Sequence, residues 1–357
     1  MKTAVISVTD NGARLAVKMA ANLTCKIDLY AKEGREGGTD ALTYASLSEL
    51  VAEIYAKYNG LVFIMATGIV VRLIAPHIRD KRYDPAVVVM DEAGRHAISL
   101  LAGHLGGANE LTHIIAKAAG ATPVITTATD IQQKPAPDVL AARIGLEIEP
   151  FDQLKHINAA IVAGQKVVYF IDCSLPNYEH YVNQAAEQCI MLVTADDLVH
   201  TDRYDAAVVI SDKELYMVKP HIFLRPATMA VGVGCRRGVP SAALFTAITD
   251  ACRKIGRSVK SVDVVATTDA KDDEIGLLAM VEQMAVPFKT YSNEQLLQSI
   301  EKYGLETSEF VEEQIGVGNV CEAAALLAAG TDKLLLGKTI YDKIAVAIAE
   351  VKSPSLD

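Results

Sequence analysis

Short apolar runs alternate with segments of helical periodicity along most of this chain, and this alternation restricts its fold more than any other feature. In the N-terminal part, strand-like runs cover residues 3–8, 26–30 and 61–65, and helical spacing covers residues 13–21 and 46–58. Strands that alternate with helices at this spacing indicate a mostly parallel sheet with helices on both faces. We therefore predict an α/β protein whose ligands bind beyond the carboxyl ends of its strands.

The middle of the chain differs in residue pattern from its two ends. The sequence QQKPAP at residues 132–137 indicates where the chain crosses from one domain to the next, and few glycine-rich loops follow it. A chain of 357 residues is also too long for one small core. We predict an N-terminal α/β domain at 1–130, a smaller α/β middle domain at 131–226 and a C-terminal α/β domain at 227–357, in which residues 341–351 form a helix or a strand. The predicted architecture is two mostly parallel α/β units that flank a smaller α/β segment.

Charge and composition argue against several classes of protein. The net charge of −10 disfavours nucleic-acid binding, which needs a basic face, but allows an anionic small molecule in a locally basic pocket. No apolar run approaches the roughly 20 residues of a membrane-spanning helix. The N-terminal apolar run meets Asp10 at once, which indicates a first strand and not a signal peptide. The six cysteines are scattered without a CxxC pair, which favours reduced thiols in a cytoplasmic protein.

Residues 66–109 contain the strongest signs of a functional site. Two predicted turns carry residues that a fold does not need, one after the apolar run 61–65 and one after the apolar run 97–101. Glycines between a buried strand and a helix let the backbone approach a ligand, and the N–H groups at a helix start favour an anion. We expect both turns at the carboxyl ends of the strands, where Thr127 could also lie. The candidate residues are Thr67, Gly68 and Arg72 in the first turn and Gly103, His104, Gly106, Gly107 and Asn109 in the second.

A further glycine-rich turn is predicted at residues 232–238. Its glycines follow the pattern G-x-G-x-x-x-G, one residue longer than the common dinucleotide fingerprint. Arg236 and Arg237 occupy positions where the backbone would approach a pyrophosphate. Binding of carboxylates or phosphates fits these residues better, because a guanidinium pairs with such groups through two hydrogen bonds. The alternative that both arginines are solvated surface charge stays open.

His104 lies among glycines at a predicted strand end, where a histidine can act as a general acid or base near neutral pH. It could equally serve only to hydrogen-bond the backbone of its loop. His96 and His113 are weaker candidates, and the spacing of His104 and His113 matches no zinc pattern, so we expect no metal bound by the protein itself. A nucleophilic Cys235 beside two arginines is a further possibility, but buried unreactive cysteine is commoner.

Three segments carry a resemblance to a known family. They are ATGIVVRLIAP at 66–76, DPAVVVMDEAGRHAISLLAGHLGGAN at 84–109 and AVGVGCRRGVP at 230–240. Together they resemble the CbiG family, the cobalt-precorrin-5A hydrolases of anaerobic cobalamin biosynthesis, over nearly the whole chain and most weakly in the middle segment. The resemblance implies a hydrolase. Water opens the ring-A δ-lactone of a cobalt-bearing tetrapyrrole, and the extruded meso carbon leaves with its methyl group as acetaldehyde, giving cobalt-precorrin-5B.

The resemblance also implies roles for individual residues. A lactone hydrolase needs a base for water and donors for the developing oxyanion, and the expected catalytic residues are His104, Thr67 and Asn109, with the amides of residues 106–109 as further donors. The macrocycle carries acetate and propionate groups, for which arginines and glycine-rich helix starts are natural partners. The expected substrate-binding residues are Gly68, Arg72, Arg95, Gly103, Gly106, Gly107, Thr127, Gly234, Arg236 and Arg237.

The expected ligand is the cobalt-containing tetrapyrrole, with no separate cofactor, because the substrate carries the cobalt. Transient contacts with other enzymes of the cobalamin pathway and a homodimer are further expectations. Two other functions stay open: a corrinoid-binding carrier of the same pathway, and a nucleotide-dependent oxidoreductase that uses the turn at 232–238. Asp263 lies about 25 residues beyond the last glycine and inside a strand pattern, which argues against the oxidoreductase.

Overall fold

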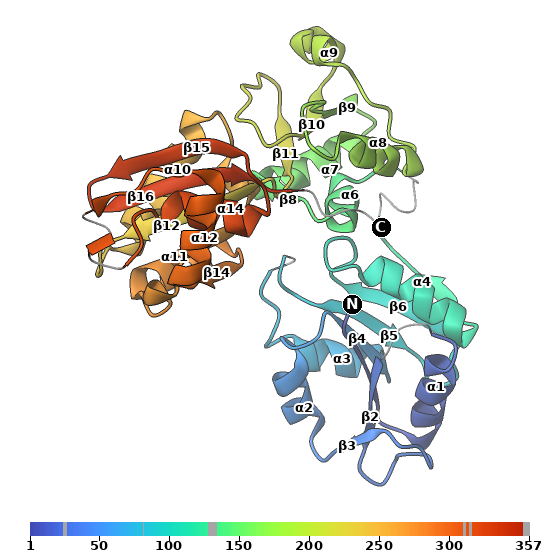
Figure 1. Cartoon of the computed structure of the whole chain (residues 1–357). Coiled ribbons are helices and arrows are strands. Elements are labelled where there is room, and N and C mark those ends of the chain that lie inside the picture. Colours follow the sequence, from blue (N-terminus) through green and yellow to red (C-terminus); the bar gives the residue numbers. More distant parts are fainter. Residues whose placement is uncertain (24–26, 81, 128–133, 310–311, 314–315, 353–357) are drawn as a thin grey trace. The chain divides into compact units, whose positions relative to one another are not determined.

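The computed structural model describes the chain except residues 24–26, 81, 128–133, 310–311, 314–315 and 353–357. The described residues form two compact units, one of residues 1–144 with 161–164 and one of residues 145–160 with 165–357 (Figure 1). The first unit contains one sheet and the second contains two. Within the described ranges, no helix combines the length and the apolar character needed to cross a membrane.

The first unit is a seven-stranded sheet in the order β3-β2-β1-β4-β5-β6-β7. Its central strands β1, β4 and β5 are buried along their whole length, because α2 and α3 cover one face and α1 and α4 cover the other (Figure 1). The strands are β1 (Thr3–Ser7), β2 (Ile27–Lys32), β3 (Leu42–Tyr44), β4 (Gly60–Ile64), β5 (Ala86–Met90), β6 (His96–Leu101) and β7 (Thr122–Val124). The helices are α1 (Asp10–Ala20), α2 (Leu47–Ile54), α3 (Thr67–Ile74), α4 (Ala108–Ala119) and α6 (Pro137–Arg143).

The connection between β5 and β6 reverses the chain direction within this sheet. Only residues 91–95 join the two strands, too few for a crossover helix, and the Asp91 carboxylate accepts three backbone N–H groups of the turn. The antiparallel register pairs Met90 with Ala97, while the other pairs in the sheet are parallel. The carboxyl end of β6 therefore lies where β1, β4 and β5 begin. We call this side of the sheet the amino edge and the opposite side the carboxyl edge.

The second unit begins with a four-stranded sheet in the order β8-β11-β10-β9, in which the β8–β11 pair is antiparallel and the other two pairs are parallel. The side chains of Val168, Ala207, Val209 and Phe223 form part of its core. Its strands are β8 (Glu147–Glu149), β9 (Val167–Ile171), β10 (Ala206–Ile210) and β11 (His221–Arg225). The helices along this stretch are α7 (Leu154–Val162), α8 (Tyr178–Glu187) and α9 (Ala195–Val199), with 3-10 turns η1 (Phe151–Gln153) and η2 (Thr201–Arg203).

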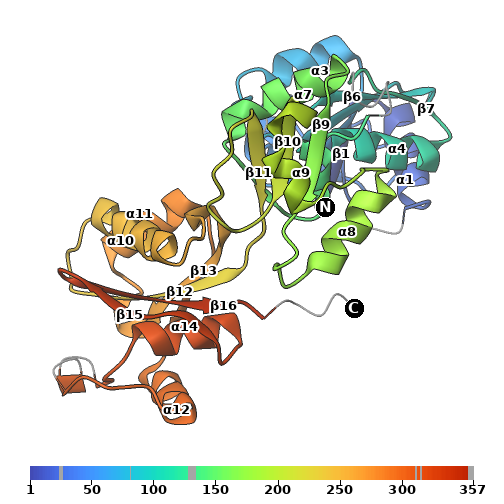
Figure 2. The same cartoon turned by 90° about the horizontal axis from the view of Figure 1, so that it is seen from above.

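The last sheet has five strands in the order β14-β13-β12-β16-β15. Helices α10 and α11 pack on one face and α14 on the other (Figure 2). Its strands are β12 (Met229–Cys235), β13 (Val262–Thr268), β14 (Phe288–Tyr291), β15 (Leu334–Tyr341) and β16 (Ile344–Glu350). Its helices are α10 (Ser241–Lys254), α11 (Ile275–Met284), α12 (Asn293–Tyr303) and α14 (Cys321–Ala329), with 3-10 turns η3 (Val259–Ser261) and η4 (Asp269–Lys271).

The predicted α/β fold class is confirmed. Parallel pairs predominate in the first two sheets, and the last sheet has two parallel and two antiparallel pairs. Residues 341–351, predicted as helix or strand, are mostly strand β16, which runs antiparallel to β12 and β15. The predicted turn at residues 67–72 is wrong. These residues form helix α3, which starts directly after β4 with Ala66 as its N-cap.

Candidate active site

The segment between β6 and α4, residues 102–107, is shaped by its glycines. Gly107 ends the segment with a φ of 81°, a left-handed conformation that glycine adopts without strain. A Cβ at Gly106 would lie 2.4 Å from Ala102 Cβ, and a Cβ at Gly103 would lie 2.8 Å from Asn109 Oδ1. The glycines therefore allow a tight loop at the amino edge and leave space for the Asn109 side chain.

Backbone N–H groups at the start of α4 are used inside this loop. Gly107 N donates to His104 O at 2.9 Å, and the amides of residues 108 and 109 donate to Ala102 O at 3.1 Å and Gly103 O at 2.9 Å. The expectation that these three amides bind a substrate oxyanion is wrong, because each has a partner within the loop. These hydrogen bonds fix the loop backbone against the start of α4.

His104 pairs with a carboxylate that helix α6 supplies. His104 Nδ1 lies 3.0 Å from Asp138 Oδ2, and the two side chains are only 10% and 6% exposed. An ionised carboxylate can only accept, so Nδ1 carries the proton and Nε2 is the basic nitrogen of the neutral ring. Sequence reasoning missed Asp138, because nothing in the pattern around Pro137 shows that this helix start lies beside His104.

Asn109 connects strand β6 to the segment that follows β7. It is 7% exposed, its Oδ1 accepts from Ser99 Oγ at 2.6 Å, and its Nδ2 donates to Thr127 Oγ1 at 3.1 Å. The structure thus brings together two residues that the sequence predicts for the site, Asn109 and Thr127. Both ends of the Asn109 amide are engaged, which holds the end of β6 and the start of α4 in place.

A cavity of about 500 Å³ opens at the same amino edge. Leu105 and Gly106 of the glycine-rich loop line it together with Tyr55, Tyr58 and Asp84. Burial, followed by the charge of Asp84, raises the pKa of Tyr55. Burial and a hydrogen bond to a carboxylate raise the pKa of Tyr58. Both phenols therefore remain protonated well above neutral pH, and each donates a hydrogen bond to a carboxylate, Tyr55 to Asp84 at 3.5 Å and Tyr58 to Asp28 at 2.6 Å.

Three other predicted residues of the N-terminal site, Thr67, Gly68 and Arg95, lie at the carboxyl edge. Thr67 and Gly68 begin α3 directly after β4, and Arg95 precedes β6 at the same edge. The expectation that this group meets the His104 loop is wrong, because β6 runs antiparallel to β5. Strand β4 has five residues, a length of roughly 16 Å. Thr67 and His104 therefore cannot contact the same lactone.

The carboxyl edge has features of a second ligand-binding region. The strand order reverses between β1 and β4, and ligands of open α/β sheets bind beyond the carboxyl ends at such a point. Arg95 is exposed there, and Arg72 is exposed in the last turn of α3, the helix that begins at this edge. Neither guanidinium forms an ion pair with any residue that the structure describes. His96 Nδ1 lies 3.7 Å from Asp91 Oδ2, with the histidine 58% exposed. Sequence reasoning rated His96 low, although the short connection at 91–95 indicates a hairpin that places it at this edge.

Gly232 and Gly234 lie inside strand β12, and the prediction of a turn at these positions is wrong. A Cβ at Gly232 would lie 1.8 Å from Cys321 O and 2.8 Å from Ala325 N, so the close approach of α14 requires glycine there. A Cβ at Gly234 would meet no atom closer than 3.9 Å. The first glycine of the fingerprint-like pattern is therefore explained by the packing of α14 on β12 and does not indicate a bound dinucleotide.

The two arginines after β12 are both exposed. Arg237 Nη1 lies 2.9 Å from Asp273 Oδ1, and Arg237 Nη2 donates to Ala270 O at 3.0 Å. No ion pair of Arg236 is found among the described side chains. Arg236 therefore keeps its charge available to a ligand, whereas Arg237 is already engaged on the surface of its own sheet.

Cys235 does not have the environment of a nucleophile. Burial raises the pKa of its thiol, and the opposing charges of Lys271 and Glu274 do not reverse this effect. A raised thiol pKa lowers the thiolate fraction near neutral pH. Over the described ranges, no three side chains of His, Cys, Asp or Glu gather as metal ligands.

Three α/β sheet regions, with a buried histidine–carboxylate pair in the first, are typical of a multidomain α/β enzyme that uses acid–base chemistry. Family models match three consecutive stretches: Cobalamin synthesis G N-terminal at 49–130, Cobalamin biosynthesis central region at 135–226 and Cobalamin synthesis G C-terminus at 229–349. The chain belongs to the CbiG family, and the predicted family is confirmed.

Relatives match along nearly the whole chain. A protein of Salmonella typhimurium named cobalt-precorrin-5A hydrolase is 34% identical over 348 residues, 95% of this chain and 95% of that protein. One of the same name from Priestia megaterium is 31% identical over 356 residues, 97% of this chain and 94% of that protein. The crystal structure of a cobalamin biosynthesis protein G homolog from Sulfolobus solfataricus is 19% identical, covers 98% of this chain and 97% of its own, and has a TM-score of 0.37.

Proposed function

We propose that this chain is a cobalt-precorrin-5A hydrolase, which opens the ring-A δ-lactone of its substrate with water and releases acetaldehyde to leave cobalt-precorrin-5B. The observation that carries the proposal is the extent of the family match. Two proteins of that name align over at least 94% of their own length with at least 95% of this chain. A chain that matches such enzymes from end to end has a counterpart of each of their units.

The reaction moves protons at two stages. Water adds to the lactone carbonyl and the ring C–O bond breaks, which yields a carboxylic acid and an alcohol. The alcohol then loses its proton while the C–C bond to the macrocycle breaks, acetaldehyde leaves, and the macrocycle carbon takes up a proton. A side chain that accepts and returns a proton near neutral pH would serve both stages.

We assign this task to His104. Asp138 fixes the orientation of the ring through Nδ1, and its carboxylate stabilises the imidazolium that forms when Nε2 takes a proton from water. The loop that carries His104 also lines the amino-edge cavity through Leu105 and Gly106. Asp138 is a positioning residue in this proposal, and Asn109 holds the loop in register.

The proposed centre contains the amino-edge residues of the predicted set: Gly103, His104, Gly106, Gly107, Asn109 and Thr127. Thr67, Gly68 and Arg95 are not part of it, because they lie at the opposite edge of the sheet. Arg72 is not part of it either, because its exposed side chain in the last turn of α3 bonds to no described residue of the His104 loop. Water is the only co-substrate, and cobalt enters within the substrate. We place the reaction in the cytoplasm, where the five described cysteines, all of them free, stay reduced.

The test is a coupled assay with purified protein and cobalt-precorrin-5A, in which alcohol dehydrogenase detects acetaldehyde through NADH loss. The wild-type protein should release acetaldehyde, and His104→Ala should lower turnover by about 10²-fold or more, the typical contribution of a general base. His96→Ala removes an exposed histidine at the carboxyl edge and should leave turnover unchanged.

Each other outcome has a defined meaning. Tight pigment binding by the wild type without acetaldehyde release would identify a carrier instead of an enzyme. No binding at all would overturn the substrate. Loss of turnover in His96→Ala with normal turnover in His104→Ala would move the chemistry to the carboxyl edge.

A further inference from the structure

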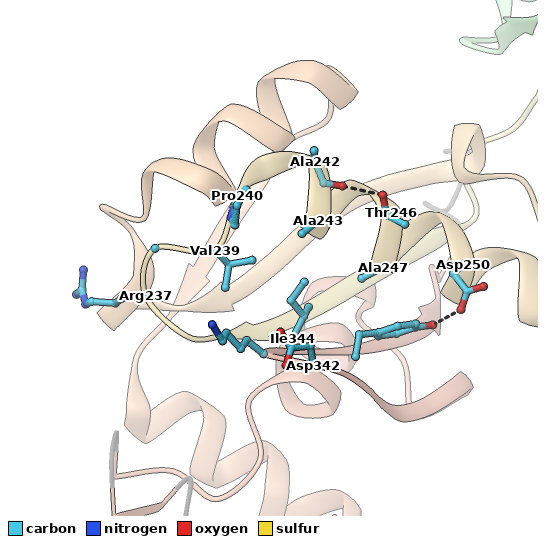
Figure 3. Close-up of a pocket in the computed structure, with 13 residues that line it drawn as sticks. Arg237, Val239, Pro240, Ala242, Ala243, Thr246, Ala247, Asp250, Asp342 and Ile344 are labelled. Carbon is cyan, nitrogen blue, oxygen red and sulfur yellow. Dashed lines mark hydrogen bonds between the residues drawn. The ribbon is translucent and has the colours of Figure 1, made fainter.

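A cavity of about 660 Å³ lies in the C-terminal sheet region, between the first turns of α10 and the hairpin turn that joins β15 to β16 (Figure 3). Val239, Ala243, Ala247 and Ile344 give it apolar walls. Its volume falls within the range of roughly 300–1,000 Å³ that small-molecule sites occupy. The family match assigns no role to this space.

The cavity exists because one face of α10 carries small side chains. Ala243, Thr246, Ala247 and Asp250 follow the spacing i, i+3, i+4 and i+7, so they share the helix face toward the hairpin, as Figure 3 shows. Ala243 and Thr246 are exposed, although the next residues along the helix, Leu244 and Ala247, are buried. Larger side chains at these two positions would fill the space.

Two of the charged groups around the cavity, Lys343 and Asp342, form no ion pair with any residue that the structure describes. Asp250 Oδ2 lies 3.2 Å from Lys254 Nζ and accepts a hydrogen bond from Tyr341 Oη at 2.9 Å. The Lys254 ammonium therefore balances the charge of the Asp250 carboxylate. The Arg237 side chain points away from the cavity (Figure 3). Lys343 and Asp342 also line the space, and Lys343 Nζ has no ion pair with any described residue.

We propose that this cavity binds a carboxylate-bearing edge of the tetrapyrrole substrate, with the apolar walls against the ring and Lys343 paired with a carboxylate arm. The inference rests on the proposed function and adds a substrate-binding position in the C-terminal sheet region. Apolar walls next to the Lys343 cation fit an organic anion that has a large apolar body, and the neighbouring Asp342 carboxylate limits how much negative charge the cavity accepts. A fully hydrated small anion would leave the walls unused.

The test compares variants for binding and for turnover of cobalt-precorrin-5A. Lys343→Gln should raise KM about tenfold, equivalent to ~1.4 kcal/mol, with kcat within twofold of wild type, since the interaction acts on binding alone. Ala243→Phe fills the cavity and should raise KM further, whereas Ala243→Ser, which barely changes its volume, should not. Arg253→Gln removes an exposed cation from the last turn of α10, outside the cavity, and should match wild type.

The outcomes separate this inference from the proposed function. Wild-type acetaldehyde release with unchanged KM in both Lys343→Gln and Ala243→Phe would overturn the cavity site and leave the hydrolase intact. No release by wild type would overturn the hydrolase, and substrate binding followed by absorbance would then test the same variants directly. Thermal unfolding checks that Ala243→Phe is folded, and if it is not, Lys343→Gln alone decides.

Discussion

Neither Gly106 nor Gly232 has room for a side chain. The atoms that would clash with a Cβ belong to the same loop at Gly106 and to a distant helix at Gly232. At Gly106 a Cβ would meet Ala102, four residues earlier in the same loop, at 2.4 Å. At Gly232 it would meet the carbonyl oxygen of Cys321, on a helix far along the chain, at 1.8 Å. The first glycine shapes a loop and the second lets a helix pack on a strand, although both belong to glycine-rich segments that suggest a ligand.

The polar side chains around the two segments differ less than the glycine contacts do. Near Gly106 they are buried and bonded to one another, as in the His104–Asp138 pair. Near Gly232 the arginine turn is exposed, as in the Arg237–Asp273 pair, whose side chains are 62% and 66% exposed, but the Lys271–Glu274 pair beside it is buried, with side chains 10% and 6% exposed. Burying polar groups carries a free-energy penalty unless they are partnered, and both segments provide such partners. The contact that each glycine makes, and not burial of polar groups, therefore separates the two segments.

The largest effect should come from Gly232. Gly232→Ala forces a Cβ against the backbone of α14 and should lower the free energy of unfolding by about 3 kcal/mol, the upper part of the usual range for overpacking. Gly234→Ala is the matched control, since its nearest neighbours lie 3.9 Å away, and its effect should stay below about 1 kcal/mol. Urea unfolding measures both, and equal stability of the two variants would contradict the packing role of Gly232.

An intermediate effect should come from Asn109. Asn109→Ala leaves the Ser99 and Thr127 hydroxyls without their partner in a part-buried site, which should destabilise the first unit by about 1–3 kcal/mol. The exposed Asn11 on α1 provides the control, and Asn11→Ala should change stability little. Differential scanning calorimetry compares the two. A stable Asn109→Ala variant with lost turnover would instead make Asn109 a catalytic group.

The smallest effect should come from the arginine turn. Arg237→Gln removes an exposed ion pair, and such pairs contribute below about 1 kcal/mol. Its urea midpoint should therefore match wild type closely, even at low salt. A loss comparable to that of Gly232→Ala would show that the turn is held by charge, and the contrast between the two glycine-rich segments would then fail.

The sequence was sufficient for the fold class and for part of the candidate site. Alternating strands and helices predicted the α/β sheets, and glycines around His104 predicted a loop that supports a functional side chain. The reversal at β5–β6 was also accessible, because residues 91–95 are too few for the crossover that a parallel pair needs. Using that connection length would have placed His96 and His104 on opposite edges.

Local pattern determined most of the strands and helices of this protein and the need for glycine in the loop around His104, since both depend on nearest neighbours and on backbone sterics. It mistook the start of α3 and the end of β12 for turns. Tertiary structure decided that Asp138 meets His104, that Gly232 meets α14, and that a cavity opens beside α10. These contacts join residues from separate elements of the chain, and they arise only when each sheet buries its apolar faces under particular helices. Short-range periodicity carries no information about which helix covers which strand.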